Sequence, residues 1–83
     1  MSCGDEAAWQ DQSIVCGDCK VLVDRFSSFY KTCEKYCQAI GLQCKGAWEE
    51  QANDCKIKYE MTCTGTVDSS DAICECFPSG GGP

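Results

Sequence analysis

The most regular pattern in the chain is an unbroken alternation of apolar and polar residues at positions 55–63. Apolar residues fill every second position, and lysine, glutamate and threonine lie between them. Because successive side chains of a β-strand point to opposite faces of a sheet, this alternation predicts a half-buried strand. Its inner face is expected to carry Cys55, Ile57, Tyr59, Met61 and Cys63.

A second short segment, 72–77, predicts another strand. It is largely apolar and follows a polar, turn-rich loop at 64–71 that contains Gly65. In a strand, Cys74 and Cys76 project from the same face, because the side-chain period is two. We therefore expect 72–77 to be a short closing strand of the same antiparallel sheet.

One main helix is predicted at about 28–40. Cys33 and Cys37 are four residues apart, so they lie one turn above each other on one helix face. Thr32 can cap the turn that begins at Cys33, and Gly41 can end the helix in a left-handed conformation. A helix packed across a short antiparallel sheet that includes 55–63 and 72–77 defines a small disulfide-rich α+β fold.

Segment 14–23 is open to two interpretations. Its β-branched residues favour a strand or an irregular segment to about Asp24. Apolar residues also recur at spacings of three and four between Val15 and Ile40, which would fit one long amphipathic helix. We favour the strand, because Ser27 and Ser28 interrupt the helical pattern with poor helix formers.

The remaining segments are predicted to connect these elements. Residues 46–54 lie before the alternating strand and can form a helical turn with Trp48, Ala52 and Cys55 on one face. Residues 2–13 are polar and acidic, and we expect them to form an irregular arm held by Cys3.

Cysteine is the most informative residue type in the composition. Ten cysteines in 83 residues indicate a disulfide scaffold, and their even number leaves no thiol unpaired. The pair at 16 and 19 would also fit half of a zinc site or a redox pair, but ten cysteines without histidine favour structural bridges. Disulfides persist in oxidising compartments, so we expect a secreted or extracellular protein. The expected disulfide residues are Cys3, Cys16, Cys19, Cys33, Cys37, Cys44, Cys55, Cys63, Cys74 and Cys76.

Charge and the absence of histidine exclude several classes of function. A net charge of −6 gives no electrostatic footprint for nucleic acid, and no apolar stretch is long enough for membrane insertion. Without histidine there is no Ser-His or Cys-His pair, so we predict no catalytic residues and no enzyme. We also predict no cofactor and no metal, because the acidic segment 68–71 is better explained by a turn than by a calcium loop.

The chain is expected to form a single domain at 1–77, followed by a flexible linker or the remnant of a tag at 78–83. The last residues are rich in glycine and proline, as linkers are. The first residues lack the basic start and apolar run of a signal peptide. We therefore expect either a part of a larger extracellular protein or a free secreted domain.

Two aromatic residues are the candidates for ligand binding. Most aromatic side chains are expected in the small core, but Trp48 has polar neighbours in the sequence, and Tyr36 lies on the flank of the predicted helix between two cysteines. An exposed aromatic ring beside polar groups suits the binding of a sugar or a protein. Trp48 and Tyr36 are therefore the predicted ligand-binding residues.

The spacing Cys33-x3-Cys37-x6-Cys44, followed by Cys55-x-Ile57-x-Tyr59, resembles the core of PAN/apple domains and the related WSC domain. The resemblance covers residues 32–59. It implies a helix on an antiparallel sheet, disulfides Cys33–Cys55 and Cys37–Cys44, and an extracellular module that binds proteins or carbohydrates. The chain departs from that pattern in its additional cysteines and in its Cys74-x-Cys76 ending.

A second resemblance, through the same spacing of the cysteines at 33, 37 and 44, is to the frizzled-type cysteine-rich domain. It implies a mostly α-helical fold that recognises lipidated or secreted signals. We rank it second, because the alternation at 55–63 favours a strand over a helix.

These observations predict an extracellular recognition module that binds a protein or carbohydrate ligand on a surface made rigid by disulfides. Such a surface would lower the ordering cost of binding. The alternative is a secreted signalling protein, like a pheromone or a toxin, that acts on a cell receptor.

Overall fold

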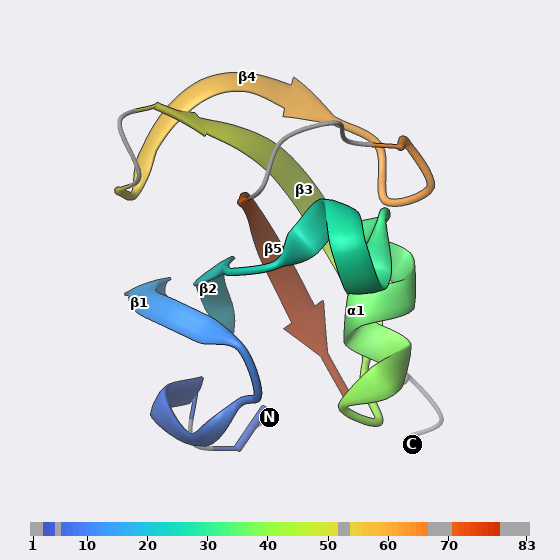
Figure 1. Ribbon diagram of the computed structural model, residues 1–83. Coiled ribbons are helices and arrows are strands. Elements are labelled where there is room, and N and C mark those ends of the chain that lie inside the picture. The colour runs from blue at the N-terminus through green and yellow to red at the C-terminus, as the bar shows by residue number, and fades with distance from the viewer. Residues whose placement is uncertain (1–2, 5, 52–53, 67–70, 79–83) are drawn as a thin grey trace.

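A computed structural model describes residues 3–4, 6–51, 54–66 and 71–78 (Figure 1). Five strands form one antiparallel sheet in the order β1-β2-β5-β3-β4. The strands are β1 (Gln12–Gly17), β2 (Lys20–Val23), β3 (Gln43–Gln51), β4 (Lys56–Met61) and β5 (Ala72–Phe77). The helical elements are a 3₁₀ turn η1 (Glu6–Ala8), a π-helical turn η2 (Phe26–Tyr30) and the helix α1 (Cys33–Ala39). A small disulfide-rich domain with a helix on an antiparallel sheet is confirmed, and the mostly α-helical alternative is wrong.

The helix α1 begins and ends where its capping residues predict. The hydroxyl of Thr32 accepts a hydrogen bond from the Lys35 backbone N–H at 3.1 Å, and Gly41 has a φ of +79°. The predicted range of 28–40 is nevertheless too long, because Lys31 has a φ of +69° and separates η2 from α1. A left-handed residue cannot continue a right-handed helix, so one long helix becomes two short pieces.

The segment after the N-terminal arm is a hairpin of β1 and β2. Gly17 pairs with Lys20 across a two-residue turn, in which Cys19 has a φ of +60°. The extended character predicted for 14–23 is confirmed, but the segment forms two strands joined by a turn instead of one, and the long amphipathic helix is wrong. The β-branched residues of β2 pack on the pleated sheet, where that residue type is favoured.

The predicted helical turn at 46–54 is wrong, because most of that segment belongs to β3. This strand pairs with β5 on one side and with β4 on the other. Backbone pairing on both sides overrides the weak helical preference of the polar residues around Trp48. Ala52 and Asn53 lie outside the described residues.

The predicted strand at 72–77 is confirmed, with the same bounds as β5. It does not close the sheet, however, because it lies at the centre between β2 and β3. Its side chains at 72, 74 and 76 face α1, and Figure 1 shows α1 lying beside this strand. The core between sheet and helix contains Val21, Val23, Phe26, Tyr30, Cys33, Tyr36, Cys37, Ala47, Ala72, Cys74 and Cys76.

The predicted alternating strand is confirmed as β4, but its predicted inner face is wrong. Ile57 is 49% exposed and Tyr59 is 52% exposed. In the pairing with β3, Tyr59 lies opposite Glu49, and Ile57 lies opposite Glu50, so Lys58 is an extra residue in a bulge. Consecutive residues of β3 face opposite sides, so the bulge places Ile57 and Tyr59 on different faces of the sheet.

All ten cysteines form disulfides. The five pairs are Cys3–Cys19, Cys16–Cys55, Cys33–Cys74, Cys37–Cys76 and Cys44–Cys63. The pairs implied by the PAN/apple resemblance, Cys33–Cys55 and Cys37–Cys44, are therefore wrong. The disulfide Cys16–Cys55 joins β1, at one edge of the sheet, to the residue before β4, at the other edge.

Two of these disulfides join α1 to β5 side by side. The helix spacing of four residues spans about 6 Å at 1.5 Å per residue. The strand spacing of two residues spans about 6.6 Å at 3.3 Å per residue. Because the two spans nearly match, Cys33 can reach Cys74 while Cys37 reaches Cys76, with Cα atoms 5.4 Å and 5.5 Å apart. The pair of bridges also requires α1 and β5 to run in the same direction.

Candidate functional site

The sheet face opposite α1 carries a distinct set of side chains. Leu22 and Ile73 are fully buried but lie outside the cluster that packs against α1. They are neighbours across β2 and β5, and Trp48 of β3 pairs with Ile73. Strand alternation therefore places all three on the same face. We name this surface the aromatic face and define it by Lys20, Lys45, Trp48, Glu75 and Phe77.

Trp48 lies on the aromatic face, where it is partly buried. Its ring packs so closely on Gly46 that a Cβ at that glycine would lie 2.6 Å from Cη2 of Trp48. Only glycine allows this approach. The Nζ atom of Lys20 lies 4.3 Å from the ring centroid, in a cation–π contact. The structure thus places the predicted residue Trp48 at a surface, with a cation over its ring.

Phe77 repeats this arrangement on the same face. The Nζ atom of Lys45 lies 4.9 Å from the centroid of its ring, and Phe77 is partly buried. Sequence reasoning missed Phe77 as a surface residue. The signal was available, because a strand that turns Cys74 and Cys76 inward must turn the residue at 77 outward.

A hollow of about 250 Å³ adjoins Phe77 and is lined by Gln43, Cys44, Lys45, Phe77 and Pro78. A second hollow of about 300 Å³ lies toward α1 and shares Gln43 and Cys44 with the first; it is lined by Glu34, Gln38, Leu42, Gln43, Cys44 and Cys63. The backbone N–H of Glu34 donates to the carbonyl of Cys63 at 2.9 Å, which fixes one wall of the second hollow. Together the hollows offer an aromatic ring, an ammonium group, amides and a carboxylate around a disulfide.

The prediction that Tyr36 binds a ligand is wrong, because its side chain is fully buried in the core. Its hydroxyl donates to the carbonyl of Gln10 at 2.8 Å, and its ring meets Tyr30 edge-on at 4.9 Å between centroids. Burial raises the pKa of Tyr36 well above its ordinary value. Tyr36 therefore holds the N-terminal arm to α1 instead of facing a ligand.

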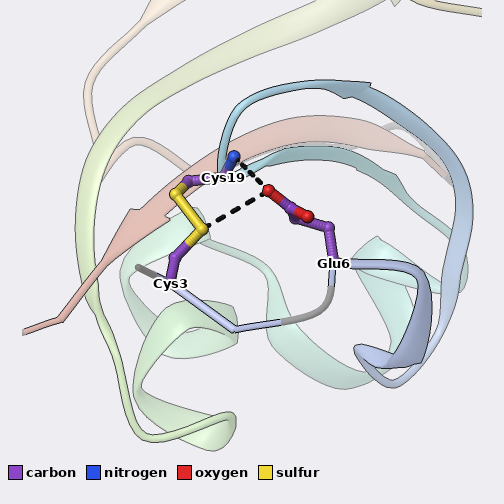
Figure 2. A group of neighbouring side chains, drawn as sticks. All are labelled: Cys3, Glu6 and Cys19. Carbon is purple, nitrogen blue, oxygen red and sulfur yellow. Dashed lines mark hydrogen bonds between the residues drawn. A yellow bond between two sulfur atoms is a disulfide. The ribbon is translucent and has the colours of Figure 1, made fainter. Parts of the chain in front are cut away.

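Cys3, Glu6 and Cys19 bring three potential metal-ligand atoms within 4.8 Å of one another (Figure 2). The two sulfur atoms are bonded to each other, so neither is a thiolate, the form that binds metals. One oxygen of Glu6 accepts the backbone N–H of Cys19 at 2.8 Å, which lowers the pKa of Glu6. The same oxygen lies 3.4 Å from the sulfur of Cys3, a contact without a proton. The group holds the arm onto the β1–β2 turn.

Four carboxylates gather where β2, β3 and β5 meet. Burial raises the pKa of Asp71, and the neighbouring charges of Asp24, Glu50 and Glu49 raise it further. Glu49 and Glu50 are themselves 8% and 9% exposed, and Glu49 accepts the Glu50 backbone N–H at 3.2 Å. The neighbouring carboxylates therefore disfavour the ionised form of Asp71. Residues 68–70, part of the calcium alternative, lie outside the described residues.

No family model matches the chain, and no curated protein or solved structure is significantly similar to it. Within the described residues, no helix has the length and apolar character needed to cross a membrane.

Proposed function

We propose that this chain is an extracellular recognition domain that binds a protein or glycan ligand on the aromatic face. The observation that carries the proposal is the pair of aromatic rings, Trp48 and Phe77, that share one sheet face, each beneath a lysine. Aromatic rings with an adjacent polar or charged group are favoured at binding surfaces.

The disulfides support this proposal in two ways. Five bridges in 83 residues are typical of extracellular proteins, in which a small core needs covalent support. Two of them fix β5, the strand that carries Phe77, to α1. A surface fixed before binding loses little conformational entropy when a ligand arrives, so a small contact area can suffice.

The two hollows suggest how a ligand would sit. A ring or side chain stacked on Phe77 would displace the Lys45 ammonium toward the ligand's polar groups. Gln43, at the boundary of both hollows, would then donate or accept hydrogen bonds. This arrangement suits a ligand with one apolar surface and several hydroxyl or carboxylate groups.

Glycan arrays and a display library of extracellular proteins, probed with the labelled oxidised chain, test the proposal. We expect saturable binding that Phe77→Ala weakens at least about tenfold, since a central aromatic contact is worth on the order of 2 kcal/mol. Lys45→Ala tests the same site without removing packed volume. Phe29→Ala is the matched control, because Phe29 is 64% exposed with Arg25 over its ring but lies on η2. Equal losses in Phe77→Ala and Phe29→Ala, or no saturable binding, would contradict the proposal.

A further inference from the structure

The edge strand β4 has properties that the aromatic face does not explain. It lies at the end of the strand order, and within the described residues only β3 pairs with it. All its residues are exposed except Met61, which is partly buried. An edge strand presents backbone N–H and C=O groups in the register that another strand needs. Natural edges are commonly protected by lysine, and β4 carries Lys56 and Lys58.

The charges of β4 are complementary to those of a second, antiparallel β4. If Tyr59 lies opposite Tyr59 of a second copy, Lys58 lies opposite Glu60 of that copy, and Glu60 lies opposite its Lys58. Opposite charges and paired aromatic rings directly across a sheet are both favourable. The register displaced by two residues also forms two opposite-charge pairs, of Lys56 with Glu60, but it places Lys58 opposite Lys58, and like charges across a sheet are unfavourable. The lysines therefore favour the register centred on Tyr59 over the register displaced by two residues.

The bulge at Lys58 limits how much of β4 can pair regularly with a second strand. Lys58 is the extra residue opposite β3, so the pairing with β3 fixes a regular alternation from Tyr59 to Met61. Glu60 pairs with Trp48, which places Glu60 on the side of the aromatic face, and Tyr59 faces the other side. The cross-strand charge pairs require Lys58 to lie on the same side as Glu60.

We propose that two copies of this chain associate through β4, antiparallel about a two-fold axis between their Tyr59 side chains. The contact makes the sheet continuous across the dimer and covers part of Tyr59, which is 52% exposed in one copy. Such an interface is isologous, so each charge pair forms twice. A short edge-to-edge contact buries less than the roughly 1,000 Å² of a stable interface, so the dimer dissociates on dilution. The proposal is independent of the ligand of the aromatic face.

Analytical ultracentrifugation of the oxidised chain, from about 5 μM to about 1 mM, tests the proposal through charge reversal. We expect a dimer that grows with concentration. Lys58→Glu and Glu60→Lys should each weaken association by at least about tenfold, because each replaces two attractive pairs with two repulsive ones. The double variant Lys58→Glu/Glu60→Lys restores both pairs with their signs exchanged, and should regain association.

Lys35→Glu is the matched control, because it makes the same change in net charge at an exposed position of α1. Circular dichroism and the intact mass of the oxidised form confirm that each variant is folded and bridged. A monomer at every concentration would overturn the proposal, as would a double variant that stays as weak as the single ones. Association of Lys58→Glu equal to that of the parent would instead fit the register in which residue 58 faces residue 58, because one like-charge pair then replaces another, and would overturn the axis at Tyr59.

Discussion

The strands β4 and β5 have the same length but differ sharply in burial. Four of the six residues of β5 are buried, whereas five of the six residues of β4 are exposed. Strand β5 has neighbours on both sides, α1 on one face and two disulfides to that helix. Within the described residues, strand β4 pairs only with β3, and Met61 is its one residue that packs against the core cluster. Period-two patterning thus establishes a strand, and the layers around the strand decide whether its apolar side chains are buried.

The largest expected effect separates two disulfides that close loops of similar length. Cys33–Cys74 and Cys16–Cys55 span 41 and 39 residues. The comparison starts from a Cys37→Ala/Cys76→Ala background, because the neighbouring bridge would otherwise keep the loop of Cys33–Cys74 closed. In that background the loss of either bridge should cost a similar loop entropy of up to about 4 kcal/mol. Cys33 and Cys74 are buried in the core, whereas Cys16 and Cys55 are partly exposed. Cys33→Ala/Cys74→Ala should therefore cost about 1–2 kcal/mol more than Cys16→Ala/Cys55→Ala, because it also leaves a cavity.

Urea unfolding of the two double variants measures this difference directly. Since loop length is matched, the additional loss in the free energy of unfolding reports how well the Cys33–Cys74 bridge is packed. Equal losses in the two variants would mean that the core around Cys33 and Cys74 is less well packed than the structure describes.

The same substitution at Ile73 and Ile57 compares the two strands without touching a disulfide. Ile73 is fully buried, and Ile57 is 49% exposed. Ile73→Ala should lower the free energy of unfolding by about 3 kcal/mol, in the range for truncation of a buried isoleucine. Ile57→Ala should cost less than about 1 kcal/mol, since about half of its surface meets water even in the folded state. Thermal unfolding of both variants measures the two losses of stability. Similar losses would mean that Ile57 of β4 lies in a packed layer, as Ile73 does.

A smaller, pH-dependent effect is expected at Asp71, beside the start of β5. Because folding raises its pKa above the ordinary 3.8, its contribution to stability is fully present below that pH and is lost as the pH rises through the raised value. Asp71→Asn removes this loss of stability, because asparagine does not ionise. The melting temperature of the variant should therefore be roughly 2–5 °C above that of the parent at pH 7 and nearly equal to it at pH 3.

The control for this prediction is Asp18→Asn, in the exposed turn between β1 and β2. It makes the same change in net charge away from the carboxylate cluster. An equal rise in melting temperature at pH 7 in both variants would show a general effect of net charge instead of an effect specific to Asp71.

The local elements were predictable because their signals lie in neighbouring residues. Thr32 and Gly41 define the end regions of α1 through backbone capping, and the alternation of β4 is readable in the sequence. The burial of Tyr36 was also readable, because it lies three residues after Cys33 and so shares the inner helix face. The identification of Tyr36 as a ligand-binding residue overlooked this spacing.

The remaining features depend on contacts distant in sequence. The strand β3 forms because β4 and β5 pair with it, and nothing in residues 43–51 alone requires that. The bulge at Lys58 depends on how β4 meets β3. The disulfide pairing was partly accessible, because C-x3-C on a helix matches C-x-C on a strand in length. The aromatic face can be predicted only when the order of β2, β5 and β3 is known, since Lys20 and Trp48 are distant in the chain.

Disulfide mapping tests the central claim, that α1 is joined to β5 by two parallel bridges. Trypsin cleaves at Lys35, between Cys33 and Cys37, and a glutamate-specific protease cleaves at Glu75, between Cys74 and Cys76. Cys37 still shares a peptide with Cys44, and Cys74 with Cys63, so chymotrypsin, which cleaves at Leu42, and an aspartate-specific protease, which cleaves at Asp71, are also used. Mass spectrometry of the unreduced peptides, kept at acidic pH after digestion, then assigns each bridge separately. The structure predicts peptides that link Cys33 to Cys74 and Cys37 to Cys76. Peptides linking Cys33 to Cys55 and Cys37 to Cys44 would contradict it.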